Sequence, residues 1–308
     1  MAVLAAASLA APGRLYRIDR LWDAGNPVRS ESLFRALLPE AEQSGDTSYR
    51  IELLTQVARA QDMQGRFEDA HATLDTCRAL LSDTMAIPWV RYFLERGRVF
   101  SSSGNPDTAK TFFVQAWTHG ALDAHLRDGA VQLMADAAHM MALIEPPVER
   151  LAWVSLAFNM AEDFTNPEAL EWLGPLFDNA GWAYFELGDY DSALGEFEKD
   201  LAFRRRLCGP AEILVAQWAV GRTLRALGRT DEALRVQEEV RSRRETGGLP
   251  PDGSNLEELG ELCLLKGDSA AARAWFARAY EELSKDESLS ETEPARLERL
   301  RQLGGAGE

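Results

Sequence analysis

Apolar residues recur every three or four positions along most of the chain, a spacing that places them on one face of an α-helix. The clearest case is residues 176–203, which form two amphipathic stretches joined by a tight turn at Gly188. The first stretch carries the small residue Gly181, and the second carries Ala193 and Phe197 on one face. A small residue opposite a large one lets two helices approach closely and interlock. We therefore expect an antiparallel helix pair.

The same pattern repeats with a period of 39 or 40 residues. The turn glycine recurs at Gly25, Gly65, Gly104, Gly188, Gly228 and Gly267. The small residue of the first helix recurs at Gly181, Gly221 and Gly260, and the large residue of the second at Phe197 and Phe276, with Gln237 as the exception. The longer interval between Gly104 and Gly188 leaves room for one degenerate repeat near Ile144. The pattern thus predicts about seven helix pairs that cover nearly the whole chain.

The order Gly181, Tyr184, Gly188, Ala193, Phe197 resembles the tetratricopeptide repeat. The long period, with a basic segment and a Gly-Pro turn in residues 204–216, resembles the kinesin-light-chain style of that repeat. The resemblance implies an all-α fold, a right-handed α-solenoid of antiparallel helix pairs. In such a stack each pair contacts only its neighbours.

We divide the chain into residues 1–160 with about four repeats, 161–283 with the three best-matched repeats, and 284–308 as a capping helix with a frayed tail. The fourth repeat is degenerate, because a Glu-Pro-Pro turn replaces the glycine and Arg150 stands where a small residue is expected. Two interpretations remain open. Either these helices pack further apart, or the solenoid bends at this repeat.

Charge and composition limit the classes of function that we expect for this chain. The chain has 308 residues, with 49 acidic against 33 basic residues and a net charge of -16, which argues against general nucleic-acid binding. It has no apolar run of the length that a membrane span needs. Three widely spaced cysteines favour a reducing, cytoplasmic location. The Ala-rich N-terminus lacks a basic region, so we interpret it as a capping helix rather than a cleaved signal.

The sequence shows no sign of an enzyme. It lacks nucleophile-elbow, phosphate-loop and Cys-x-x-Cys motifs, and its four histidines are scattered. Asp136 and His139 lie three residues apart on one predicted helix, but no second pair completes a metal site. We therefore expect no catalytic residue, no cofactor and no metal.

The resemblance implies a groove lined by the first helix of each pair, in which the family binds extended peptides or partner helices. Its register assigns to this groove Asn179, Trp182, Trp218, Arg222, Arg225, Arg59, Arg91 and Arg98. An amide such as that of Asn179 can both donate to and accept from a peptide backbone. Arg222 and Arg225 share a helix face and can clamp a carboxylate, while tryptophans provide large rigid contact areas.

Two interpretations of the arginines compete. They form a wall for an acidic segment of a partner, or they pair with carboxylates of the groove itself, such as Glu95 and Asp178. The function we expect is a protein–protein interaction scaffold that binds a protein or peptide partner. The alternatives are a ligand- or peptide-sensing module that acts in trans and a self-associating structural subunit. The sequence leaves the oligomeric state open.

Overall fold

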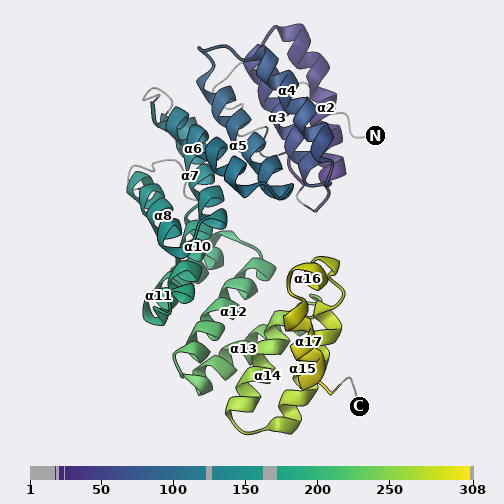
Figure 1. Ribbon diagram of the computed structural model, residues 1–308, viewed down its shortest axis with the longest axis vertical. Helices are drawn as coiled ribbons and strands as arrows, with labels where there is room; N and C mark the ends of the chain where they lie inside the picture. Colours follow the sequence, from purple (N-terminus) through teal and green to yellow (C-terminus); the bar gives the residue numbers. More distant parts are fainter. Residues whose placement is uncertain (1–17, 19–20, 24, 123–126, 162–171, 306–308) are drawn as a thin grey trace. The chain divides into compact units, whose positions relative to one another are not determined.

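A computed structural model describes residues 18, 21–23, 25–122, 127–161 and 172–305 (Figure 1). These residues form fifteen helices and no strand, so the all-α prediction is confirmed. The chain groups into two compact units, Met1–Trp172 and Leu173–Glu308, and each is described by itself.

The first unit contains α2 (Pro27–Ser44), α3 (Thr47–Asp62), α4 (Phe67–Leu80), α5 (Ala86–Ser102), α6 (Pro106–Leu122), α7 (Arg127–Ile144) and α8 (Pro147–Ala161). The second contains α10 (Leu173–Glu186), α11 (Tyr190–Leu207), α12 (Pro210–Ala226), α13 (Thr230–Thr246), α14 (Gly253–Leu265), α15 (Ser269–Leu283), α16 (Glu287–Thr292) and α17 (Pro294–Leu303). Within each unit most consecutive helices pack side by side as antiparallel neighbours, and α17 packs against α15 (Figure 1).

Glycine ends the first helix of most pairs. Gly65, Gly104, Gly188, Gly228 and Gly267 all have φ between 71° and 81°, a left-handed conformation that glycine adopts without steric cost. The predicted turn at Gly25 is different, because that residue does not have a positive φ. There Asn26 caps α2, accepting a hydrogen bond from the Arg29 amide at 3.0 Å, and Pro27 begins the helix.

The predicted interlock of small and large residues is confirmed. A Cβ atom added to Gly181 would lie 2.5 Å from a ring carbon of Phe197, and one added to Gly260 would lie 2.7 Å from Phe276. In each case the two residues are sixteen positions apart. Only a glycine lets the phenylalanine ring lie directly against the first helix, and the helices of a pair are held close as a result.

The exception in the sixth repeat has a polar explanation. Gln237 lies against Gly221 and is completely buried. Its amide donates to the Trp218 carbonyl at 3.0 Å and accepts from the Asn255 side chain at 2.7 Å. Because its polar atoms are bonded, this glutamine fills the aromatic position at little cost.

The fourth repeat turns without glycine, between the end of α7 and the start of α8. Glu145 in this turn forms an ion pair with Lys110 at 2.7 Å, which ties the turn to α6. In the register that places Arg150 opposite Ala193, the positions of Gly181 and Phe197 are taken by Ala138 and Val154, which are both buried. The degenerate repeat therefore has smaller apolar residues at this pair of positions.

Candidate functional site

The first helices of the second unit bring most of the predicted site residues together. Trp182 on α10 and Trp218 on α12 lie with ring centroids 5.8 Å apart. The guanidinium carbon of Arg222 lies 5.6 Å from the Trp218 ring and 5.6 Å from that of Phe185. Such cation–π contacts hold a guanidinium over aromatic faces. We call the side chains that α10, α12, α14 and α17 contribute to this side the first-helix surface.

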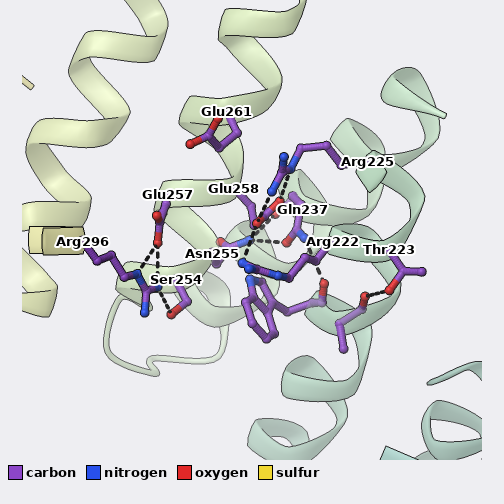
Figure 2. A network of polar contacts seen from close by, with 12 residues as sticks. Arg222, Thr223, Arg225, Gln237, Ser254, Asn255, Glu257, Glu258, Glu261 and Arg296 are labelled. Atoms are coloured by element: carbon purple, nitrogen blue, oxygen red, sulfur yellow. Dashed lines mark hydrogen bonds and ion pairs between the residues drawn. The ribbon is translucent and has the colours of Figure 1, made fainter. Parts of the chain in front are cut away.

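A buried glutamate engages both predicted arginines of α12, as Figure 2 shows. Glu258 on α14 is 1% exposed and accepts hydrogen bonds from Arg222 Nη1 at 2.9 Å and from Arg225 Nε and Nη2 at 2.6 and 2.9 Å. The hydrogen bonds from Arg225 make a two-pronged contact, the strongest geometry between these groups. The hydrogen bond to Glu258 raises the pKa of Arg225, which therefore stays charged.

The charge pattern continues from α14 to α17. Arg296 donates to Glu257 Oε2 through Nε at 2.8 Å and Nη2 at 2.6 Å, and Arg299 pairs with Glu261. Figure 2 shows Glu257 turned towards Arg296, on the side of α14 away from Arg222. The surface thus carries arginines on α12 and α17 and glutamates on α14 between them. Because most of this charge is paired within the chain, the arginines do not form an unpaired positive wall.

Two hydrogen-bond donors of α12 stand out from this network. Trp218 Nε1 and Arg222 Nε are both shielded from solvent, and neither has an acceptor among the described residues. A shielded N–H group without an acceptor costs about 1–3 kcal/mol. The two residues lie one helical turn apart on the same helix. Because both atoms are shielded, an acceptor on another molecule can reach them only if the side chains of Trp218 and Arg222 move.

Asn179 is less exposed to solvent than the other predicted site residues of this unit. It lies on α10 but is only 5% exposed, so its amide is not presented to solvent in this structure. The neighbouring Asp178 lies near Asp200, and burial, assisted by that second carboxylate, raises the pKa of Asp178 to about 6. This end of α10 is a buried polar environment.

The remaining predicted arginines belong to the first unit. Arg98 on α5 lies 3.5 Å from Glu95 and also donates to Asp136 on α7. Arg59 on α3 lies 4.0 Å from Glu95. Asp136 is thus held by an arginine, and within the described ranges no group of three His, Cys, Asp or Glu side chains is arranged to hold a metal ion.

Arg91 on α5 lies 3.7 Å from Glu52 and is only 3% exposed. In this unit, as in the second, arginines of one first helix pair with acids of a neighbouring one, either the next or the previous along the chain. Glu95 was predicted from the sequence as such an acid, but Glu258 was not predicted as the partner of Arg222. The signal is the spacing: opposite charges on successive first helices are separated by 33 to 39 residues, close to one repeat period.

Comparison with known proteins identifies the repeats. A family model for the tetratricopeptide repeat matches residues 176–211 and 219–246, and a second model of the same name matches residues 55–76 and 256–278. The chain contains tetratricopeptide repeats. Such repeats are generally protein–protein interaction scaffolds. No curated protein matches the sequence.

Several solved structures share this fold at low sequence identity. One is a signal transduction ATPase with a tetratricopeptide repeat sensor from Pyrococcus horikoshii, with a TM-score of 0.66 and 16% identity over 94% of this chain and 43% of that one. Another is a Rap protein complexed with competence and sporulation factor, with a TM-score of 0.62 and 14% identity over 94% of this chain and 79% of that one. A third is BtubC from P. vanneervenii, with a TM-score of 0.58 and 16% identity over 76% of this chain and 94% of that one.

The hydropathy of the helices bears on whether any of them could cross a membrane. In the part of the chain that the structure describes, each helix falls short of the length or apolar character that a membrane crossing needs.

Proposed function

We propose that this protein is an interaction scaffold that binds an extended polypeptide segment of a partner on the first-helix surface of its second unit. The observation that carries the proposal is the pair of neighbouring tryptophan rings, Trp182 and Trp218, with the partly exposed guanidinium of Arg222 beside them. An extended peptide offers a carbonyl at every residue, and each carbonyl accepts hydrogen bonds. The two tryptophans supply the rigid contact area on which such binding usually depends.

An acidic side chain on the partner suits the same surface. Arg222 and Arg225 share a single carboxylate, that of Glu258, whereas Arg296 and Arg299 pair with Glu257, Glu261 and Glu293. A carboxylate of the partner placed beside Arg222 would give this arginine an acid of its own. In this proposal Asn179 lies at the end of the surface, while Arg59, Arg91 and Arg98 take equivalent positions in the first unit.

The test is affinity capture from the native cell extract with the full-length protein. Wild type is compared with Trp218→Ala and Arg222→Met, and with Leu207→Ala, a control at an exposed apolar residue of α11. Circular dichroism verifies that each variant is folded. A polypeptide that wild type and the control retain, and that both surface variants lose, supports the proposal. A partner held equally by all four proteins refutes the assignment to this surface.

A second candidate is a peptide-sensing module that acts in trans in the cytoplasm. It is favoured by two structures of the same fold, one described as having a tetratricopeptide repeat sensor and the other as a complex with competence and sporulation factor. A ligand that binds only the folded state raises the melting temperature. We expect the peptide-sized fraction of the extract to raise it for wild type and not for Trp218→Ala. A rise that needs the protein fraction instead favours the scaffold, and a mass that grows with concentration favours self-association.

A further inference from the structure

A cavity of about 290 Å³ lies in the second unit, apart from the first-helix surface. It is formed where α13 ends and α14 begins, with one wall from α15. Its charged lining consists of Arg241 and Arg244 from α13 and Arg278 from α15, with Glu245 and Asp252 as the acids. Three arginines against two acids leave one positive charge, on a protein whose net charge is -16.

The three arginines are used differently. Arg244 donates to the Pro250 carbonyl at 2.9 Å and lies 3.4 Å from Asp252, so it fixes the loop between the helices. Arg241 gives one Nη to Glu245 at 2.9 Å, while its Nε lacks an acceptor among the described residues. Arg278 has no hydrogen bond or ion pair to any described residue.

Trp275 holds the two available guanidinium groups in place. The guanidinium carbon of Arg278 lies 4.9 Å from the centroid of the Trp275 ring, and that of Arg241 lies 5.8 Å from it. A stacked guanidinium keeps its N–H donors free for an anion. The aromatic contact therefore pre-positions Arg278 and Arg241 without using their hydrogen bonds.

The rest of the lining is largely apolar. Leu249 and Pro251 from the loop and Leu256 from α14 border the same cavity. Asp252 accepts from the Ser254 and Asn255 amides, so these N-terminal amides of α14 are already occupied and leave recognition to the arginines. The volume lies near the lower end of the range for ligand pockets, which suits a group the size of one amino-acid residue.

We propose that this cavity binds the carboxylate of a small ligand with an apolar side group, such as a C-terminal leucine or a free branched-chain acid. A single uncompensated positive charge favours a monoanion, because Glu245 and Asp252 would repel the second charge of a phosphate group. Arg278 and Arg241 would hold the carboxylate, and Leu249, Pro251 and Leu256 would cover the apolar group. This site is separate from the one proposed above and does not depend on it.

The test is calorimetric titration of the full chain with N-acetyl-leucine and with N-acetyl-leucinamide, which lacks only the charge. Probes are used up to about 10 mM, since ligands of this size reach only weak affinities. We expect the acid to bind at least about tenfold more tightly than the amide, as one lost charged contact implies. Equal binding of acid and amide, or no binding of either, overturns the proposal.

Variants locate the site. Arg278→Gln is expected to weaken N-acetyl-leucine binding about tenfold, as the loss of a charged hydrogen bond predicts. Arg235→Gln removes the same charge from an exposed position on α13 outside the cavity lining and should leave binding unchanged. An equal effect of both variants would mean that only overall charge matters and would refute the site. A peptide Ala-Ala-Ala-Leu that binds more tightly than N-acetyl-leucine identifies a peptide C-terminus as the source, and equal affinity identifies a free acid.

Discussion

The close contact between Gly260 and Phe276 predicts that Gly260→Ala changes stability in opposite directions in two backgrounds. It should destabilise the wild-type protein and stabilise a variant with a smaller residue at position 276. A Cβ at position 260 would lie 2.7, 2.8 and 3.0 Å from three carbons of the Phe276 ring, which is 1% exposed. Overpacking of a core typically costs about 1–3 kcal/mol. Alanine gains about 1 kcal/mol over glycine within a helix. Gly260→Ala should therefore lower the free energy of unfolding by about 1 kcal/mol, the middle of the net range.

The second repeat of the same chain shows how the clash is removed. There Ala58 and Leu74 occupy the two equivalent positions, and both are completely buried in one apolar cluster. In a Phe276→Leu background the clash is relieved, so Gly260→Ala should raise the free energy of unfolding by about 1 kcal/mol from helix propensity alone. The coupling between the two substitutions is then about 2 kcal/mol, within the range for residues in contact.

Urea unfolding followed by circular dichroism measures this coupling for wild type, the two single variants and the double variant. Gly195→Ala in α11 is the control, because a Cβ there meets no atom within 4 Å. It should stabilise by about 1 kcal/mol in either background. The reasoning is refuted if Gly260→Ala stabilises wild type as the control does, or if its effect is the same in wild type and in the Phe276→Leu background.

Three further predictions concern charge and thiol chemistry. Glu258→Gln should destabilise the second unit by about 2–3 kcal/mol because it leaves two arginines without their carboxylate, whereas Glu261→Gln, whose partner is half exposed, should cost less than about 1 kcal/mol in the same unfolding assay. Burial raises the pKa of Asp62 to about 6. The folded state binds this proton more tightly than the unfolded state, so the group's contribution to stability is present below about pH 4 and is lost as the pH rises through about 6. Asp62→Asn should therefore be more stable than wild type at about pH 7 and as stable as wild type in acid. A difference in stability that does not change with pH would contradict this prediction. Cys208 is exposed, whereas burial raises the pKa of the Cys77 thiol to about 12, so a thiol reagent should label the first quickly and the second only on unfolding.

The repeats were predictable because they depend on single residues at fixed spacing. The structure requires glycine at the turns, where Gly188 and Gly228 have positive φ, and opposite Phe197, because no other residue fits there as well. These glycines therefore recur at fixed spacing in the sequence, and the family resemblance and the all-α solenoid were predicted from them. The turn at Gly25 was predicted on spacing alone, and there the helix cap at Asn26 takes over.

The pairing of charges was harder to predict. Arg222 had several acids within reach of its long side chain, and Asp178 rather than Glu258 was named as a partner for the groove arginines. Which acid pairs with the arginine depends on burial and on the rotation between successive helix pairs, and neither can be predicted from a local sequence pattern. The cavity beside Arg278 was not predicted for a similar reason. Its lining joins two second helices, the loop between α13 and α14 and the start of α14, so no single periodic signal marks it.

The interlock has a consequence for how the protein would respond to force. Each glycine–phenylalanine contact joins the two helices of one pair, so a pair is a mechanical unit as well as a structural one. A chain pulled from its ends should yield one pair at a time rather than all at once. Releasing about 40 residues, the interval from Gly188 to Gly228, adds up to about 140 Å of extended chain. The array would act as an extensible tether, lengthening in near-equal steps and recoiling as pairs re-form.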